Sequence, residues 1–315
     1  MTEFKFPHSA EGIRDELDYF KVPMTDRSVE SCHYEKKHSL TNINEPYGAI
    51  LFEHLATSGS HIDLKNSYLY VRGKVVKTAG TALPEGEAVS TSNLLLHSLF
   101  ENATLSLNGT TVSDAENNYP YIAYNNILSR HGEGTKTSEL TSQLFYMDDK
   151  PGTGGDTNTG FKARKGIIAE SALVEMCGKL ELDIFNAPRY IPPGVNLTLR
   201  LTKANPEFWL WTEAEPTGGV PYKFVFEECV FVMRKINVYP AIAAKHEAQV
   251  KRSRFYLPTP KTVMRTFTAP SGTYNFQAES LFGGRLPERL LIQFVDASAY
   301  TDWQVLQESV RIQSL

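Results

Sequence analysis

The nearest approach to a metal-ligand set in this sequence is a group of three residues close to its start. Cys32 and His33 are adjacent, and His38 follows five positions after His33. On a β-strand, positions 33 and 38 point to opposite faces, so one shared ion would require a bend in the strand. We interpret these residues as polar strand positions and predict no metal site.

Two pairs of adjacent carboxylates, Asp148-Asp149 and Glu227-Glu228, are the next candidates for acid–base chemistry. Neighbouring strand residues face opposite ways, so neither pair forms a carboxylate dyad by itself. We interpret the first pair as part of a loop and the second as the mark of a β-bulge. His97 lies among leucines and is interpreted as a satisfied or half-exposed helix residue rather than a catalyst.

A glycine-rich stretch, residues 152–160, has part of the spacing of a phosphate-binding loop. Phe161 stands where a lysine must follow the last glycine, and no strand precedes the stretch. Without the Lys-Ser/Thr pair the motif cannot hold phosphates, so we predict an exposed loop. The sequence also has no Gly-x-Ser-x-Gly elbow and no cysteine in an evident helix-N-terminal setting. We predict no catalytic residue, no cofactor and no enzymatic activity.

The charge balance argues against nucleic acid as a partner. The net charge is −4 over 315 residues, and basic and acidic residues are interspersed. Counterion release from a phosphate backbone needs a basic field that this balance does not supply. We interpret the basic clusters at 162–165 and 251–254 as solvated loop or helix ends, and we expect no sequence-specific nucleic-acid binding.

The cysteines and the lengths of the apolar runs indicate the cellular compartment in which the protein resides. Cys32, Cys177 and Cys229 are odd in number and far apart, which favours buried free thiols in a reducing compartment. The N-terminal residues have no apolar signal region, and no run approaches the roughly 18 apolar residues of a spanning helix. We expect no standard secretion signal and no membrane span.

The stretch 178–238 indicates the fold class. Apolar and polar residues alternate with period two over 179–184 and 195–202, which is typical of strands that bury one face. Three prolines between them, within 186–194, predict a wide corner. The apolar run 224–233 predicts a strand inside a large β core.

Turns and helices are predicted to decorate a β-sandwich. Asn108-Gly109 is the pair best suited to a tight hairpin turn. Short helices are predicted over 93–100, 118–128 and 137–146 by apolar spacing on one face.

A second β block follows an alanine-rich helix predicted over 240–251. Its strand candidates are 261–267, 274–278 and 289–295. Three strands cannot close a sandwich alone, so this block must lean on the first one or on further chain.

An ordered series of segments gives the chain a family resemblance. The segments are Ile62-Asp63-Leu64 with 68–71, Leu96-His97-Ser98-Leu99-Phe100, Leu107-Asn108-Gly109, Tyr119-Pro120-Tyr121, 140–146, Val232-Met233-Arg234-Lys235 and 280–290. In order and approximate spacing, from about Leu17 to Tyr300, the series resembles the major capsid protein of Polinton (Maverick) elements and related adintoviruses.

This resemblance implies an all-β double jelly roll with short helices in its loops. It further implies homotrimers that form pseudo-hexagonal capsomers of an icosahedral shell around double-stranded DNA, with a minor capsid or penton protein as a second partner. The chain would then reside in virions, and in the cytoplasm or nucleus of a host cell. Loops 79–89 and 148–160 are the expected places for contacts between subunits.

The resemblance also divides the chain. We expect an N-terminal arm over 1–25, a first jelly roll over 26–239, a connecting helix or linker over 240–256, and a partial second jelly roll over 257–315. Family members continue past the position of Tyr300 with further strands, whereas Thr301-Asp302-Trp303-Gln304 diverges here. We therefore expect the second roll to be incomplete.

Two other readings stay open at this point. One is a transposon-derived host protein that acts as a jelly-roll module binding carbohydrate or protein without assembling a shell. The other is a cupin-like metalloenzyme, which would need His and Glu ligands converging inside one barrel.

Overall fold

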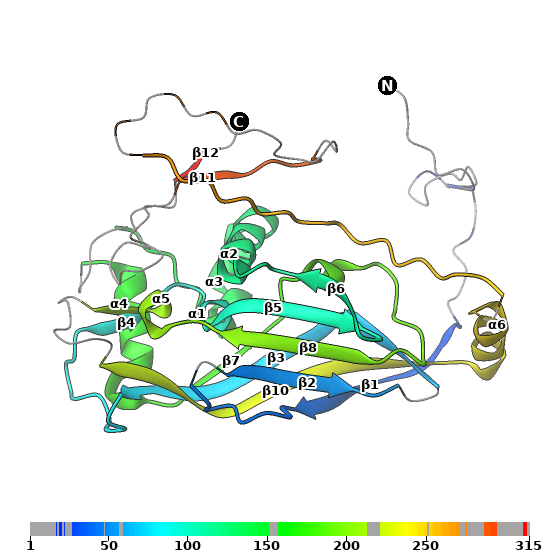
Figure 1. Cartoon of the computed structure of the whole chain (residues 1–315), viewed down its shortest axis with the longest axis horizontal. Coiled ribbons are helices and arrows are strands. Elements are labelled where there is room, and N and C mark those ends of the chain that lie inside the picture. The colour runs from blue at the N-terminus through cyan, green and yellow to red at the C-terminus, as the bar shows by residue number, and fades with distance from the viewer. Residues whose placement is uncertain are drawn as a thin grey trace.

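Two antiparallel sheets form the body of the protein, so the all-β class predicted from the sequence is confirmed. The computed structural model describes residues 17, 19–20, 22, 27–46, 48–56, 59–150, 157–212, 221–250, 252–270, 272, 275, 277, 287–294 and 311–313. The sheets face each other, and most of the short helices gather at one end of the sandwich (Figure 1).

Each sheet has four strands. The first has the order β1 (Val29–His38), β10 (Tyr222–Val238), β3 (Ser60–Lys77) and β7 (Val174–Gly178). The second has the order β2 (Ala49–His54), β8 (Leu197–Lys203), β5 (Phe100–Leu107) and β6 (Thr110–Asp114). Every pairing within them is antiparallel.

The strand order is that of a jelly roll. When these eight strands are numbered one to eight along the chain, the sheets have the orders 1-8-3-6 and 2-7-4-5. Apart from the β5–β6 hairpin, successive strands therefore cross from one sheet to the other, the double-sheet arrangement of two Greek keys. All eight strands lie between Val29 and Val238, inside the range expected for the first jelly roll.

The core lies between the sheets and follows from period-two alternation. In β8, Leu197, Leu199 and Leu201 are buried while the residues between them are not, which confirms the strand predicted there. Across the sandwich, the rings of Phe52 and Phe231 lie 6.3 Å apart. Each large apolar side chain buried this way contributes on the order of 1.5–3 kcal/mol.

The strand predicted over 179–184 is wrong. Leu180 and Leu182 are buried, as the alternation requires, but β7 ends at Gly178 and the chain then turns into the 3-10 helix η4 (Asp183–Asn186). No ladder pairing joins 179–182 to a neighbouring strand among the described residues. Alternation showed which side is buried, but it could not show whether a partner strand was present.

The hairpin predicted at Asn108-Gly109 is confirmed. β5 and β6 pair across it, and Asn108 and Gly109 have φ of 49° and 77°, the left-handed region that this turn demands. A register shift between Phe226 and Glu228 confirms the bulge predicted at the carboxylate pair.

Short helices and one extra strand pair complete the body. They are α1 (Leu95–Ser98), α2 (Tyr119–Arg130), α3 (Glu133–Thr137), η2 (Glu139–Gln143), α4 (Thr159–Ile168), η3 (Ala169–Ser171) and α5 (Pro206–Trp209), with β4 (Val89–Thr91) pairing with β9 (Leu210–Thr212). The helices predicted over 93–100 and 118–128 are confirmed as α1 and α2. The region predicted as one helix over 137–146 is instead the end of α3 followed by the 3-10 helix η2.

The chain leaves the sandwich through α6 (Pro240–Val250), which confirms the helix predicted there and lies at the end opposite α4 (Figure 1). Residues 252–270, called here the extended segment, then run back along the sandwich without helix or strand. The strand predicted over 261–267 is therefore wrong.

Two three-residue strands occur farther along the chain. β11 (Ile292–Phe294) pairs with β12 (Arg311–Gln313), and β11 falls within the strand predicted over 289–295. Of the candidate at 274–278, three residues lie outside the described part of the chain. The second jelly roll stays a prediction.

Candidate interaction surfaces and buried polar clusters

The residues considered for metal binding lie on an edge strand. β1 exposes Cys32, His33 and His38 to solvent. Within the described ranges, no group of three or more His, Cys, Asp or Glu residues is placed to hold a metal ion. Of the three free cysteines only Cys229 is buried, while Cys177 is half-buried. The prediction of buried thiols is therefore wrong for Cys32, because β1 is an edge strand whose outer face is uncovered.

His97 belongs to a buried polar network. Its Nδ1 lies 2.8 Å from the hydroxyl of Tyr119, and its Nε2 lies 2.8 Å from Oε1 of Gln143. The amide oxygen can only accept, so Nε2 carries the proton and Nδ1 accepts from the Tyr119 hydroxyl. That hydroxyl accepts in turn from the backbone N–H of Glu181 at 3.3 Å.

The network holds a neutral imidazole out of reach of any substrate. His97 is 1% exposed, and burial lowers its pKa to about 4 although the hydrogen bond to Gln143 acts in the opposite direction. The sequence interpretation of His97 as a satisfied residue is confirmed. The network joins α1, α2 and η2 to Glu181, in the stretch of chain that follows β7.

A fully buried arginine, Arg164, forms hydrogen bonds at the start of the loop that begins at Asp148. Nε of Arg164 donates to the carbonyl oxygen of Thr91 at 2.8 Å, and one terminal nitrogen donates to that of Tyr146 at 2.5 Å. The other terminal nitrogen lies 2.9 and 3.1 Å from the two carboxylate oxygens of Asp148. We call this arrangement the Arg164 cluster. It joins α4, β4 and the start of the loop.

The Arg164 cluster corrects one interpretation. Arg164 is part of the basic run 162–165, which is predicted from the sequence to be solvated, yet its exposure is 0%. Arg164 lies three residues after Phe161 and four before Ile168, both of which are buried on the same face of α4. The spacing of Phe161, Arg164 and Ile168 is the sequence signal that Arg164 is buried. It can be recognised only once a helix is predicted over 159–168.

The far end of the same loop is fixed beside its start. Asn158 caps α4 by accepting from the backbone N–H of Phe161, and Oδ1 of Asp149 accepts from the backbone N–H of Thr159 at 2.9 Å. This backbone hydrogen bond lowers the pKa of the Asp149 carboxyl. Asp148 and Asp149 thus lie in a loop, as predicted, and act as its anchors.

Gly160 is required where the two ends of this loop meet. A Cβ there would lie 2.6 Å from the carbonyl oxygen of Met147 and 2.7 Å from that of Tyr146. We expect Gly160→Ala to lower the free energy of unfolding by about 1–3 kcal/mol, because backbone atoms must move. Denaturant unfolding followed by circular dichroism measures this.

Gly166 in the same helix supplies the matched control. No atom lies within 4 Å of a Cβ built there, so Gly166→Ala is expected to stabilise the protein by about 0.5–1 kcal/mol through helix propensity. Equal effects of the two substitutions would show that the contacts at Gly160 do not constrain the loop.

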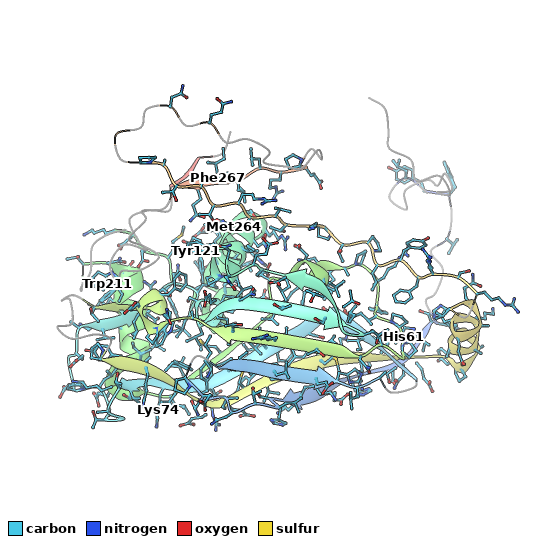
Figure 2. All side chains as sticks on the ribbon, viewed as in Figure 1. His61, Lys74, Tyr121, Trp211, Met264 and Phe267 are labelled. Atoms are coloured by element: carbon cyan, nitrogen blue, oxygen red, sulfur yellow. The ribbon has the colours of Figure 1, made fainter. Side chains whose placement is uncertain are left out.

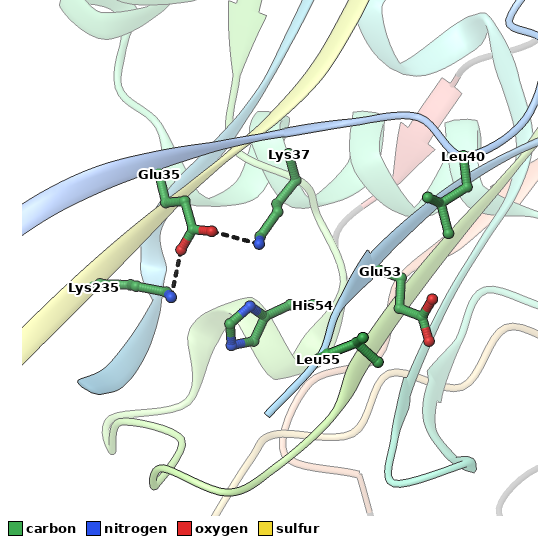
Figure 3. A pocket seen from close by; sticks show the side chains of 7 residues that line it. All are labelled: Glu35, Lys37, Leu40, Glu53, His54, Leu55 and Lys235. Atoms are coloured by element: carbon green, nitrogen blue, oxygen red, sulfur yellow. Dashed lines mark ion pairs between the residues drawn. The ribbon is translucent and has the colours of Figure 1, made fainter. Parts of the chain in front are cut away.

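An ionic pocket of about 280 Å³ opens between the edge strands β1 and β2 (Figure 3). Polar side chains line the pocket at the ends of two strands whose apolar side chains form the core. On β2, His54 follows the buried Phe52 by two positions, and on β10, Lys235 follows the buried Met233 by two positions. Glu35 forms ion pairs with both Lys37 and Lys235.

The Glu35 carboxylate of this pocket is held ionised by its two lysine partners. Burial alone would raise the pKa of Glu35, but the hydrogen bonds from Lys235 and Lys37 outweigh it and lower the pKa to about 2. Burial, together with the two lysines, lowers the pKa of His54. A carboxylate that stays ionised at every physiological pH cannot serve as a general acid. The pocket therefore closes the side of the sandwich with ion pairs.

Loop 79–89 is fixed against the end of the sandwich that carries α4. The backbone N–H of Leu83 donates to Oγ of Ser171 at 2.8 Å, and the hydroxyl of Tyr222 donates to Glu87 at 2.6 Å. A hollow of about 260 Å³ lies between this loop and α4. The described side chains that line this hollow form no ion pair with one another, so we assign it no chemistry.

The extended segment presents apolar side chains to solvent. It is held by Arg189, which donates to the carbonyl oxygen of Tyr256 at 2.9 Å, and by Asp183, whose two carboxylate oxygens each accept from Thr262 at 2.8 Å. Its exposed apolar side chains, with those just before β11, are Phe255, Tyr256, Val263, Phe267, Leu290 and Leu291. Figure 2 shows Met264 and Phe267 on the side of the sandwich that carries Tyr121 of α2. The extended segment is thus tied to the sandwich by polar contacts and carries exposed apolar side chains.

Comparison with known proteins gives distant similarities. No protein-family model matches the chain. An uncharacterized protein of Caenorhabditis elegans is 25% identical over 251 residues, which are 77% of this chain and 58% of that protein. The chain therefore spans little more than half the length of this relative.

Two solved structures overlap most of the chain. The cryo-EM structure of the Sputnik virophage is similar with a TM-score of 0.44 and 11% identity, over 76% of this chain and 55% of that one. The Faustovirus major capsid protein is similar with a TM-score of 0.43 and 11% identity, over 74% and 58%. The class of this protein, an all-β jelly-roll sandwich, follows from its own strand order.

Among the described residues, no helix has the length and apolar character needed to cross a membrane.

Proposed function

We propose that this chain is a structural subunit of a virus-like protein shell and that it works through its surfaces without catalytic turnover. The jelly-roll strand order carries the proposal, since this architecture is characteristic of capsid proteins. The series of segments that resembles the Polinton and adintovirus major capsid protein supports it independently.

The filled interior favours a shell subunit over a cupin-like enzyme. Cupin chemistry needs polar ligands converging inside the barrel, whereas the space between these sheets is occupied by aromatic rings. Phe231 contacts both Phe52 and Phe185, at centroid distances of 6.3 and 6.0 Å. A site inside this roll would require removing side chains of the core.

The same proposal assigns the parts of the chain. Residues 1–25 would be an arm, 26–239 the first jelly roll, 240–256 the linker and 257–315 part of a second roll. Exposed apolar side chains on the extended segment support a neighbour that covers it. Homotrimers would build pseudo-hexagonal capsomers in virions, with a minor capsid or penton protein as a further partner and without sequence-specific nucleic-acid contacts.

Assembly state tests the proposal. We expect size-exclusion chromatography with light scattering to give trimers, and negative-stain electron microscopy at high protein concentration to show hexagonal lattices or shells. A monomer at all concentrations that binds a glycan on an array would overturn the shell function and favour the jelly-roll binding module.

A further inference from the structure

The ionic pocket between β1 and β2 contains basic side chains from three strands. Lys37 comes from β1, His54 from β2 and Lys235 from β10, and all three line the pocket together with Glu35. Figure 3 shows the His54 ring beside the ammonium groups of both lysines. Strands from both sheets thus supply nitrogen atoms to one space at the open side of the sandwich.

These nitrogen atoms have more hydrogen-bonding capacity than the described side chains use. His54 is 5% exposed, and its Nδ1 is buried without a hydrogen-bond partner. Each lysine forms an ion pair with Glu35, although an ammonium group carries three N–H donors. Among the described residues, neither lysine has a second acceptor. Buried polar groups are nearly always hydrogen-bonded, and the Lys235 side chain is only 9% exposed. The pocket therefore lacks an acceptor.

The charges around His54 favour a negative ligand beside its ring. Those that face the ring are Lys235 of β10 and Lys37 and Glu35 of β1. Burial lowers the pKa of the ring most, the two lysines lower it further, and the opposing effect of the carboxylate is the smallest. Glu53 also lines the pocket, but it is exposed and Figure 3 shows its carboxylate directed away from the ion pairs. An anion at the ring is thus attracted by two charges and opposed by one.

We propose that this pocket binds one small tetrahedral oxyanion of the phosphate or sulfate class. The ammonium groups of Lys37 and Lys235 and the imidazole of His54 each donate a hydrogen bond to one oxygen of the ion, and bonds from ammonium to an anion are charge-assisted. The flexible stem of Lys37, whose side chain is 23% exposed, lets its ammonium close over the ion. A pocket of about 280 Å³ lies below the roughly 300–1,000 Å³ of sites for drug-sized ligands, which favours a small ion.

Binding of the ion is coupled to uptake of a proton by His54. The negative charge favours the imidazolium form, so it raises the pKa of the ring above its value in the free protein. The bound state then holds more protons than the free state, and the affinity for the ion rises as the pH falls. Glu35 has a pKa of about 2 and stays ionised between pH 6 and pH 8, so it does not cause this dependence.

Isothermal titration calorimetry of the purified full chain with sodium sulfate tests the proposal. Sulfate keeps its double charge from pH 6 to pH 8, so the ion itself does not titrate. We expect one saturable site at pH 6, with an affinity that falls by up to about tenfold per pH unit towards pH 8, the limit for one coupled proton. Sodium chloride at the same ionic strength should show no saturable binding. A chain that shows no saturable sulfate binding at pH 6 overturns the proposal.

Variants of the lining residues separate a built site from general attraction of anions. Lys235→Gln and His54→Gln should each weaken sulfate binding by at least about tenfold, the loss of one hydrogen bond to a charged group. His54→Gln should also remove the pH dependence. Lys162→Gln, exposed on α4, is the matched control and should bind sulfate as the parent chain does. Equal affinities in the parent and both lining variants overturn the proposal.

Glu35→Gln distinguishes loss of the site from loss of the fold. Removing the carboxylate takes away the one opposing charge and frees both ammonium groups, so sulfate affinity should rise by about tenfold. Structural damage lowers affinity and cannot produce this gain. A Glu35→Gln variant that is folded by circular dichroism and binds sulfate no more tightly than the parent overturns the proposal. None of these results depends on whether the protein assembles into shells.

Discussion

Replacing Arg164 by methionine is expected to lower the free energy of unfolding by about 3–5 kcal/mol, the cost of removing one partner from a buried ion pair. Arg164 has 0% side-chain exposure and Asp148 has 11%. Methionine fills much of the same space, but it leaves the Asp148 carboxylate and the carbonyl oxygens of Thr91 and Tyr146 without their donors. Denaturant unfolding monitored by circular dichroism measures the loss.

Neighbouring substitutions show whether the loss comes from the Arg164 cluster. Lys162→Met lies on the exposed face of the same helix and should change stability by less than about 0.5 kcal/mol. Arg164→Lys keeps the charge but not the planar fork that serves three acceptors, so we expect an intermediate loss. Adding Asp148→Asn to Arg164→Met should recover part of the loss, because the unpaired charge is removed. A methionine variant as stable as the parent chain contradicts the assignment.

Sequence patterns predicted secondary structure correctly where the pattern depends only on local properties of one strand or turn. The alternating leucines of β8 and the Asn108-Gly109 hairpin depend on period two and on the tolerance of positive φ, which are local properties. The two predicted strands that failed, 179–184 and 261–267, also alternate or carry β-branched residues. They lack a partner in the described structure, and pairing depends on segments far away in the chain.

The buried clusters were beyond sequence reasoning for a related reason. His97 and Gln143 are 46 residues apart, and nothing in either segment specifies the other. Arg164 follows a run of Gly, Thr and Asn whose propensity favours a loop, so α4 was missed and the arginine was assigned to solvent. Tertiary contacts decided both cases.

Acidification is expected to destabilise the protein through His97 at pH values above those at which Glu35 is protonated. The pKa of His97 is about 4 in the folded protein, against the ordinary histidine value of 6.5 that applies to the unfolded chain. Because the folded pKa is the lower one, the unfolded chain binds the proton first. The stabilisation is fully present above pH 6.5 and is lost as the pH falls towards 4, by up to about 3 kcal/mol.

The loss has a structural cause in the network around the imidazole. A second N–H on the ring would point at the Tyr119 hydroxyl, which already donates to Nδ1 and accepts from the N–H of Glu181. The charge itself would be buried without a counter-ion, since Gln143 offers only an amide oxygen. Glu35 begins to lose its own contribution only below pH 4.5, as the pH falls towards its pKa of about 2. Burial raises the pKa of the Glu181 carboxyl above its ordinary value, so the interval from pH 6.5 to 4.5 reports on His97 only through a comparison with a His97 variant.

A difference measurement isolates His97 from the other buried histidines. Burial also lowers the pKa of His54 and His61, so the parent chain must be compared with His97→Asn at each pH. The stability advantage of the parent should shrink by about 2–3 kcal/mol between pH 7 and pH 4.5. His33→Asn, on the exposed face of β1, should leave the pH profile unchanged. A constant difference between parent and His97→Asn would mean that the imidazole can be charged in place, and that the network of Tyr119 and Gln143 accepts a proton without unfolding.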